Sequence, residues 1–397
     1  MNHPGTASDS WTLDPDVTFL NHGSFGACPR SVQDAQREFR AALEREPVDF
    51  LLHAYPELLD AARDALARFV GTAPDTLAFV PNATTGVNTV LRSLHFNPND
   101  EILVTDQGYN ACTNAARYVA ARFRARIVTA TLPWPIASDD EIVASIVAAV
   151  TPRTRLAIID HVTSPTAVVL PVAEITRALQ SEGVQVIVDG AHAPGMLELS
   201  LPGIGADYYT GNCHKWMCAP KGAAFLHVRA DRQDGIVPLT ISHGWNVRRD
   251  GRSLFHDTFD WTGTSDPSAV LSVPAAIAAL GSWLDGGVGA LRARNRDLAI
   301  QAREILLEAI PDVPVCGPDL LGAMAAVSLP ASLANTYPGA YAFHRRLRAA
   351  GFEVPVQAGP RDRLLLRVSA QIYNDGAQYQ ALADALPDLI ESAANGR

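Results

Sequence analysis

Short apolar runs alternate with amphipathic segments through the first two thirds of the chain. The apolar runs predict buried strands at 101–106, 125–132, 155–162, 184–190, 206–211 and 223–229. Apolar residues at helical spacing predict helices at 81–94, 111–123 and 172–183. Such alternation is typical of a mostly parallel sheet covered by helices on both faces. Ligands of open sheets bind beyond the carboxyl ends of the strands, so polar residues there are the first candidates for a site.

The last third of the chain has a different pattern. A long helical stretch near 267–309 is followed by predicted strands at 323–330, 352–356 and 363–369 and helices at 338–350 and 375–393. We therefore predict an α/β fold, with a large, mostly parallel domain joined to a smaller α+β C-terminal domain. The predicted parts are an N-terminal segment at 1–20, a large domain at 21–265, a linking helix at 266–290 and a small domain at 291–397.

Composition narrows the class of protein and its partners. With 397 residues, 48% hydrophobic and 19% charged, the chain is expected to form a globular protein with a sizeable core. A net charge of -10 without a basic run argues against nucleic acid or an anionic membrane as partner. No apolar run approaches a membrane span, and residues 1–16 lack the apolar core of a signal peptide.

Five scattered cysteines fit reduced thiols in a cytoplasmic protein better than a disulfide framework. Cys213 and Cys218 lack the CxxC spacing of a zinc site, and we predict no metal.

Lysine is almost absent from the chain. Lys215 and Lys221 are the only two lysines, against 30 arginines. Arginine stays protonated, whereas a desolvated lysine loses its proton and can form a Schiff base with a carbonyl group. A lysine in so arginine-rich a chain is a candidate for amine chemistry. From composition alone, the explanation that two lysines were retained by chance is equally good.

Four other features suggest a ligand. Asp189 ends an apolar run, where a carboxylate caps a turn or holds a pyridinium nitrogen protonated. Thr84 and Thr85 begin the helix at 81–94, where they cap the helix or bind phosphate. Tyr109 follows a strand and either packs or stacks on a flat ring. Arg367 lies in an apolar run and needs a carboxylate, from a substrate or from an internal salt bridge.

Together these features suit pyridoxal 5'-phosphate (PLP) acting on an amino acid. No GxxxxGK[ST] motif and no GxGxxG after a strand occur, so nucleoside triphosphates and dinucleotides lose support.

The chain resembles the fold-type I PLP enzymes of the class V aminotransferase family, and most closely their isopenicillin N epimerase-like branch. This resemblance implies an aspartate aminotransferase-like, PLP-binding large domain. The matching segments are "LNHGSFGACP" (20–29), "EPVDFLL" (46–52), "PNATTGVN" (81–88), "DHVTSPTAVVLPV" (160–172), "VDGAHAPG" (188–195), "GNCHKWMCAPKGAAFLH" (211–227), "WTGTSDPS" (261–268) and "RVSAQIYN" (367–374).

The resemblance also implies residue roles. Lys215 matches the lysine that binds the cofactor as a Schiff base, Asp189 the carboxylate on the pyridine nitrogen, and Tyr109 the stacked ring. Arg367 matches the binder of the substrate's α-carboxylate. The other implied positions are His192 and Thr163 near the phenolic oxygen, Thr84, Thr85, Asn212 and His214 at the phosphate, and Asn21 and His22 at the substrate entrance.

Thr264 resembles a threonine that reaches the phosphate from a neighbouring subunit, which implies a homodimer with shared sites. Lys221 falls in a turn and is expected to be structural.

Two departures from similar sequences concern the reaction and the substrate. Cysteine desulfurases carry a mobile nucleophilic cysteine before the matching arginine, whereas the loop at 353–363 has none, so persulfide-forming desulfuration is not expected. Cys316 lies earlier and is predicted to be a buried thiol. His53 stands where many similar sequences have arginine, which suggests a different substrate. The region 239–251 is expected to help shape the pocket, with Arg248 and Arg249 either meeting an acidic group or lying solvated on the surface.

The predicted activity is removal of the Cα proton of an amino acid, followed by epimerisation or by elimination of a β-substituent. Transamination is an alternative, and a non-catalytic binding module is another, against which Lys215 and Arg367 argue. The side chain of the substrate does not follow from the sequence.

Overall fold

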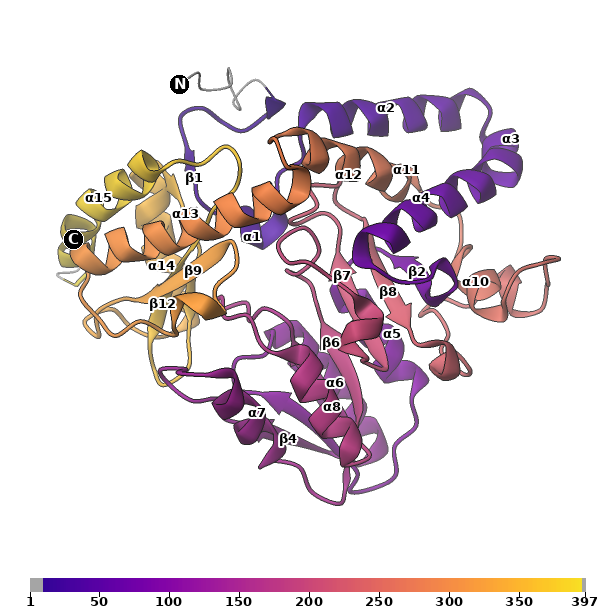
Figure 1. Ribbon diagram of the computed structural model, residues 1–397, viewed down its shortest axis with the longest axis horizontal. Helices are drawn as coiled ribbons and strands as arrows, with labels where there is room; N and C mark the ends of the chain where they lie inside the picture. Colours follow the sequence, from indigo (N-terminus) through magenta and orange to yellow (C-terminus); the bar gives the residue numbers. More distant parts are fainter. Residues whose placement is uncertain (1–9, 395–397) are drawn as a thin grey trace.

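The computed structural model describes residues 10–394, and at its centre lies a seven-stranded sheet (Figure 1). The strand order is β2-β8-β7-β6-β5-β3-β4. β8 runs antiparallel to both neighbours, and the other neighbouring pairs are parallel, which confirms the predicted sheet. The strands are β2 (Leu77–Val80), β3 (Glu101–Thr105), β4 (Arg126–Ala130), β5 (Thr154–Asp160), β6 (Gln185–Asp189), β7 (Tyr208–Asn212) and β8 (Ala224–Val228).

Part of the predicted N-terminal segment, residues 1–9, lies outside the described residues, and with it most of the stretch considered for a signal peptide. Residues 395–397 of the predicted small domain also lie outside them.

Helices cover both faces of the sheet because alternate strand residues point to opposite sides. In β5, Ala157 and Ile159 pack with the core that contains α4, α7, α8 and α12, whereas Leu156 and Ile158 pack with α5, α6 and α10. The helices up to residue 259 are α1 (His22–Phe25), α2 (Arg30–Arg45), α3 (Pro47–Asp49), a π-helix (Phe50–Ala54), α4 (Tyr55–Val70), α5 (Ala83–Ser93), α6 (Asn110–Phe123), α7 (Asp139–Val147), α8 (Val172–Ser181), α9 (Leu201–Ile204) and α10 (Leu254–Phe259).

The strand order changes direction at β3. The chain passes from β3 to β4 on one side, and then to β5, β6 and β7 on the other. The loops after β3 and β5 meet there, since the backbone N–H of Tyr109 donates to Oδ1 of Asp160 at 3.1 Å. Such a switch point is where open α/β sheets usually bind ligands.

The C-terminal part contains a small antiparallel sheet in the order β11-β12-β9, as predicted for an α+β domain. The N-terminal strand β1 (Thr18–Phe19) pairs with β10 (Phe352–Glu353), so the start of the described chain joins this part. The remaining elements are β9 (Met324–Ser328), β11 (Val356–Ala358), β12 (Leu364–Ser369), α14 (Tyr337–Ala349) and α15 (Gly376–Ala394).

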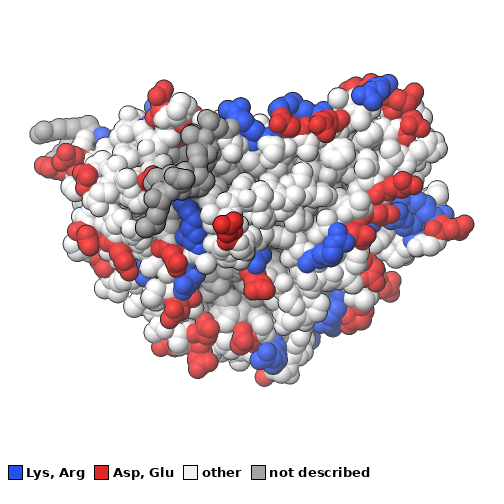
Figure 2. All heavy atoms as spheres, turned by 45° about the horizontal axis from the view of Figure 1, so that its top comes forward, with Lys and Arg blue, Asp and Glu red and all other residues white. Residues whose placement is uncertain are grey.

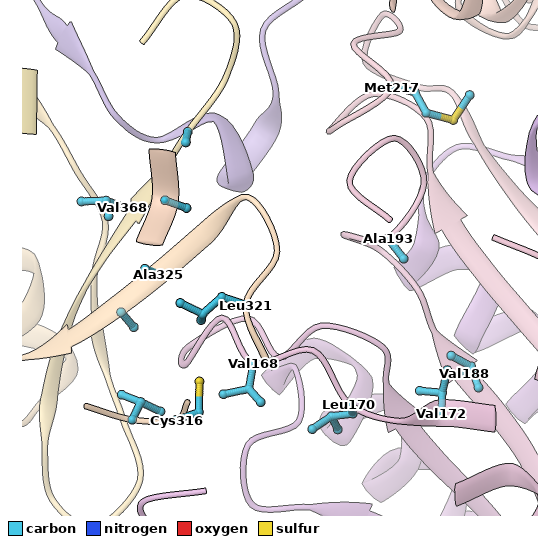
Figure 3. Packing of buried hydrophobic residues seen from close by; sticks show 14 of the residues in the cluster. Val168, Leu170, Val172, Val188, Ala193, Met217, Cys316, Leu321, Ala325 and Val368 are labelled. Atoms are coloured by element: carbon cyan, nitrogen blue, oxygen red, sulfur yellow. The ribbon is translucent and has the colours of Figure 1, made fainter. Parts of the chain in front are cut away.

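The two parts share one hydrophobic core (Figure 3). Val168, from the loop after β5, forms a backbone bridge with Leu321, just before β9. Cys316 packs in the same core and is 3% exposed, as predicted for a buried thiol. The small domain is therefore packed against the carboxyl edge of the large sheet.

The helical stretch predicted near 267–309 is broken into α11 (Ser268–Leu271), α12 (Val273–Ser282) and α13 (Gly287–Ala309). Gly286 and Gly287 have φ angles of 94° and 64°, a left-handed conformation that glycine adopts without strain and that turns the chain between α12 and α13. In Figure 1, α13 runs from α12 to the small domain. Within residues 10–394 no single helix is long and apolar enough to cross a membrane, and Ser268–Ser282 with α13 qualifies only as a pair bent by 71°.

Figure 2 shows acidic and basic side chains interspersed around a largely uncharged area on the face that it presents. On that face the basic groups form no continuous patch of the kind that binds nucleic acid.

The central strand β6 offers a test of the core. We expect Val186→Ala, at a fully buried position, to lower the free energy of unfolding by about 2 kcal/mol through lost burial and a cavity. Val313→Ala, at a position 59% exposed, is the matched control and should change it by less than about 0.5 kcal/mol. Urea unfolding followed by circular dichroism measures both, and equal effects would contradict the described packing.

Candidate functional site

A cavity of about 130 Å³ lies at the carboxyl edge of the sheet. Strands β5, β6 and β7 end at its wall with Asp160, Asp189 and Asn212, and the N-terminus of α5 closes one side. Parallel strands bring these ends together although they are far apart in sequence. Seven of the residues predicted from sequence line the cavity: Thr84, Tyr109, Asp189, His192, Asn212, His214 and Lys215.

Lys215 has its amine inside this cavity. Its Nζ lies 3.2 Å from Nε2 of His192, whose Nδ1 accepts a hydrogen bond from the indole N–H of Trp216 at 3.4 Å. Burial, and next the positive charge of Arg367, lower the pKa of Lys215 to about 8. Burial likewise holds the pKa of His192 well below its ordinary value. Burial in the cavity therefore shifts both the amine and the imidazole toward their neutral forms.

Two carboxylates face the cavity from neighbouring strands. Asp189 Oδ1 accepts the backbone N–H of Ala191 at 3.0 Å, and its Oδ2 accepts the thiol of Cys112 at 3.0 Å. Burial, and next the charge of Asp189, raise the pKa of Asp160 well above its ordinary value. Asp189 is thus the better candidate for the ionised carboxylate that a protonated ring nitrogen needs.

Sequence reasoning missed Asp160 and Cys112. The available signal was that "RLAIID" ends in aspartate as "VQVIVD" does, and that neighbouring parallel strands end side by side.

The N-terminus of α5 fits a phosphate. Asn82 accepts the backbone N–H of Thr85 at 2.8 Å, and Asn212 accepts that of Ala83 at 2.9 Å, which fixes the turn. Thr84 lines the cavity between them. Gly86 lets the helix approach β7, because a Cβ there would lie 2.2 Å from the Thr210 hydroxyl. Helix N-terminal N–H groups and hydroxyls at this position can hold an anion.

Arg367, on β12, is 1% exposed and has no carboxylate partner among the described residues. Its Nη1 donates to the carbonyl oxygen of Ser164 at 2.6 Å, its Nη2 donates to the hydroxyl of Ser24 at 3.2 Å, and its Nε has no partner in that part of the chain. Burial lowers its pKa to about 10. Ser24 and Ser164 both line the cavity. Residues 10–394 thus provide no internal salt bridge for this buried cation, which is placed to receive a carboxylate from a ligand.

A larger vestibule of about 640 Å³ adjoins the cavity. Phe25, Tyr109 and Ser164 line both spaces, so the vestibule leads to the cavity. Asn21 lines the vestibule and donates to Glu353 at 2.9 Å, and its role at a substrate entrance stays a prediction.

Six predicted residues do not line the cavity: Arg367 and Asn21, described above, and Thr85, Thr163, His22 and Thr264. The hydroxyl of Thr85 donates to Asn82, and that of Thr163 bonds Thr166 within its own turn. His22 is fully buried between the Tyr373 hydroxyl and the carbonyl oxygen of Lys215, where it supports the lysine segment. Thr264 is exposed on the surface.

The predicted surface residues also have defined places. Lys221 is exposed in the turn before β8, and His53 is exposed on the π-helix. Arg249 is bound to Asp257 at 2.8 Å and Arg248 to the carbonyl oxygen of Gly244 at 2.6 Å, so neither lies at the cavity. No group of three or more histidine, cysteine or acidic residues within residues 10–394 is arranged to hold a metal.

The described residues fit PLP. A buried amine, a carboxylate at a strand end and the N-terminus of a helix surround one small cavity, and an unpaired buried arginine lies beside it. These groups match the aldehyde, the ring nitrogen and the phosphate of PLP and the carboxylate of an amino acid.

Comparison with known proteins agrees with this geometry. Residues 26–333 match the family model "Aminotransferase class-V". The chain is 38% identical to isopenicillin N epimerase of Streptomyces clavuligerus, over 95% of this chain and 96% of that protein. It is 33% identical to a putative L-cysteine desulfhydrase 1 of Oryza sativa subsp. japonica, over 94% and 83%.

Among solved structures, a C-DES variant with glycine covalently linked to its PLP cofactor superposes with a TM-score of 0.81 at 22% identity. The superposition covers 94% of this chain and 97% of that one, and it supports the fold.

The two lysines allow a matched test of the amine. Lys215→Ala should remove the visible absorbance of covalently held PLP, and borohydride should no longer fix PLP to the protein, because the cavity then contains no amine. Lys221→Ala should keep both signals, since Lys221 is exposed outside the cavity. Absorbance spectra and intact-mass measurement check this. Retained covalent PLP in Lys215→Ala would refute the assignment.

Proposed function

Because the chain belongs to the class V aminotransferase family, whose cofactor is pyridoxal 5'-phosphate, we propose that it removes the Cα proton of an amino acid and acts as an epimerase or a β-eliminating lyase. The observation that carries this proposal is Arg367, a buried guanidinium without a carboxylate partner among the described residues, beside the cavity of Lys215. An amino acid supplies the carboxylate that Arg367 lacks. It also supplies the Cα proton that the amine of Lys215 can remove.

The protein's own groups divide the work. PLP, when bound, supplies the electron sink that makes the Cα proton acidic. Arg367 orients the substrate through its carboxylate, and Asp189 holds a proton on the ring nitrogen. Lys215 accepts the Cα proton, a role for which its lowered pKa of about 8 suits it near neutral pH.

Epimerisation needs a second proton donor that differs from Lys215. Of the three residues that line both cavity and vestibule, Tyr109 is the one with a titratable side chain. Tyr109 is 42% exposed, so its phenol can exchange protons with solvent. We assign it the second proton transfer in an epimerase. A lyase needs no such donor, because the β-substituent leaves with the electrons.

The vestibule supports a substrate larger than cysteine. Its volume of about 640 Å³ compares with about 130 Å³ for the inner cavity, and the two adjoin at Tyr109. An amino acid anchored at Arg367 can therefore extend a bulky side chain toward Asn21 and Glu353. This size favours epimerisation of a specialised amino acid over breakdown of a small one.

Tyr109→Phe separates the two reactions, since it removes the phenol but keeps the ring. For the wild-type holoenzyme with a panel of amino acids in deuterated water, NMR should show deuterium at Cα together with inversion. In Tyr109→Phe the Cα exchange should persist, while inversion falls about 100-fold or more. Tyr341→Phe, in the vestibule, is the matched control and should behave as wild type.

Each other result has a defined meaning. Loss of a β-substituent would establish the lyase, and a keto acid would establish transamination. Exchange with no member of the panel, in holoenzyme that covalently holds PLP, would count against the proposed catalysis and favour a binding module.

We further propose that the protein works as a homodimer in the cytoplasm. Leu52, Trp245 and Val247, which we call the apolar face, are 64%, 55% and 53% exposed, and Leu52 and Val247 line a common hollow of about 200 Å³. Exposed apolar area of this kind is typical of subunit interfaces. Thr264 is exposed, as a residue donated to a second subunit would be. The five free cysteines fit a reducing compartment.

A charge on the apolar face tests the dimer. Val247→Asp should convert the dimer to a monomer in light scattering, because an interface must then bury an unpaired carboxylate. It should also weaken PLP binding if Thr264 completes the neighbouring site. Val313→Asp, at an exposed position in the C-terminal part, should change neither property. An unchanged mass for Val247→Asp would reject this interface.

A further inference from the structure

A hydrogen-bonded chain of three side chains ends at the amine of Lys215. The indole N–H of Trp216 points to Nδ1 of His192 at 3.4 Å, and Nε2 of His192 lies 3.2 Å from Nζ of Lys215. An indole nitrogen only donates, so Nδ1 of His192 must accept. A neutral imidazole that accepts at Nδ1 carries its proton on Nε2.

The direction of the second hydrogen bond follows from the first. With its proton on Nε2, His192 can only donate toward Lys215, and only an unprotonated amine has a lone pair to accept it. His192 is 3% exposed, and its burial favours the neutral ring that this arrangement requires. This hydrogen bond therefore stabilises the unprotonated form of Lys215, which is the form that acts as a nucleophile or a base.

We propose that Trp216 is a positioning residue that fixes the Nε2–H tautomer of His192, and so supplies Lys215 with a hydrogen-bond donor that stabilises its unprotonated amine. The same Nε2–H is then available as a donor on the edge of the cofactor that the family resemblance assigns to His192. The relevance to catalysis rests on the proposed function, whereas the tautomer itself does not.

The indole is held rigidly enough for this role. Trp216 is 1% exposed and packs with Val162, Met196 and Met324. Its ring lies 4.9 Å from that of His22. Gly195, at a φ of 90°, passes so close that a Cβ there would lie 2.4 Å from the carbonyl carbon of Trp216. The close packing of both the backbone and the ring of Trp216 favours one orientation, in which the indole N–H faces His192.

Other charged groups around Lys215 come from separate elements. Arg367 of β12 disfavours its protonated form, whereas Asp189, Cys112 and Asp160 favour it. Substitution of Trp216 alters none of these four groups, so a change in the titration of Lys215 would report the hydrogen-bonded chain.

The scarcity of lysine makes the test direct. Protein labelled with ¹³C,¹⁵N-lysine gives two side-chain signals, from Lys215 and Lys221. In the cofactor-free full-length protein, Trp216→Phe should raise the pKa of Lys215 by about half a unit or more, because His192 is then free to accept from a charged amine. The pKa of Lys221 should stay unchanged. Trp11→Phe, at a buried tryptophan 3% exposed, is the matched control and should shift neither lysine.

A second measurement needs no tryptophan variant. ¹⁵N-histidine spectra of the wild-type holoenzyme and of the cofactor-free protein should show His192 with its proton on Nε2, with the signal assigned by its loss in His192→Gln. A proton on Nδ1, or a Lys215 pKa that does not move in folded Trp216→Phe, would overturn the proposal. Both readouts are independent of turnover, so their failure is distinct from failure of the proposed reaction.

Discussion

The site depends on keeping charged groups away from water. Asp160 and Arg367 are buried and Lys215 is half-buried where the sheet meets the small domain, and desolvation disfavours the charged form of each. A fold accommodates a desolvated ionisable group only if the group becomes neutral or is paired with an opposite charge. Here Asp160 and Lys215 are shifted toward their neutral forms, whereas Arg367 is left to pair with the carboxylate of a ligand.

The parallel sheet makes this concentration of polar groups compatible with a stable core. In β5 and β6 a buried apolar run directly precedes the last residue, so the polar side chains of Asp160 and Asp189 lie where these strands end. The helices then cover the apolar faces and leave the carboxyl edge free. The small domain covers part of that edge through the shared core around Val168 and Leu321, and the vestibule leads from the surface to the amine.

Much of the fold followed from local patterns, because buried parallel strands are continuous apolar runs that are easy to recognise. Lys215, Asp189 and Thr84 were found because chemistry, strand ends and helix starts mark them in sequence. Trp216 and Cys112 were not, since their roles arise from side-chain hydrogen bonds between segments far apart in the chain. The long helix was predicted without its break because the glycine conformation at 286–287 depends on packing as well as sequence.

Arg367 also links the two parts of the molecule. The guanidinium is carried by β12, whereas its oxygen partners, Ser24 and Ser164, belong to helix α1 and to the loop after β5. A carboxylate bound at Arg367 would contact both parts of the molecule. Its binding therefore depends on the spacing between the two parts. Helix α13 packs against β9 and β12 of the small domain and contributes no residue to the cavity. Substitutions along α13 that change this spacing would therefore change which amino acids bind, while the residues that line the pocket stay the same.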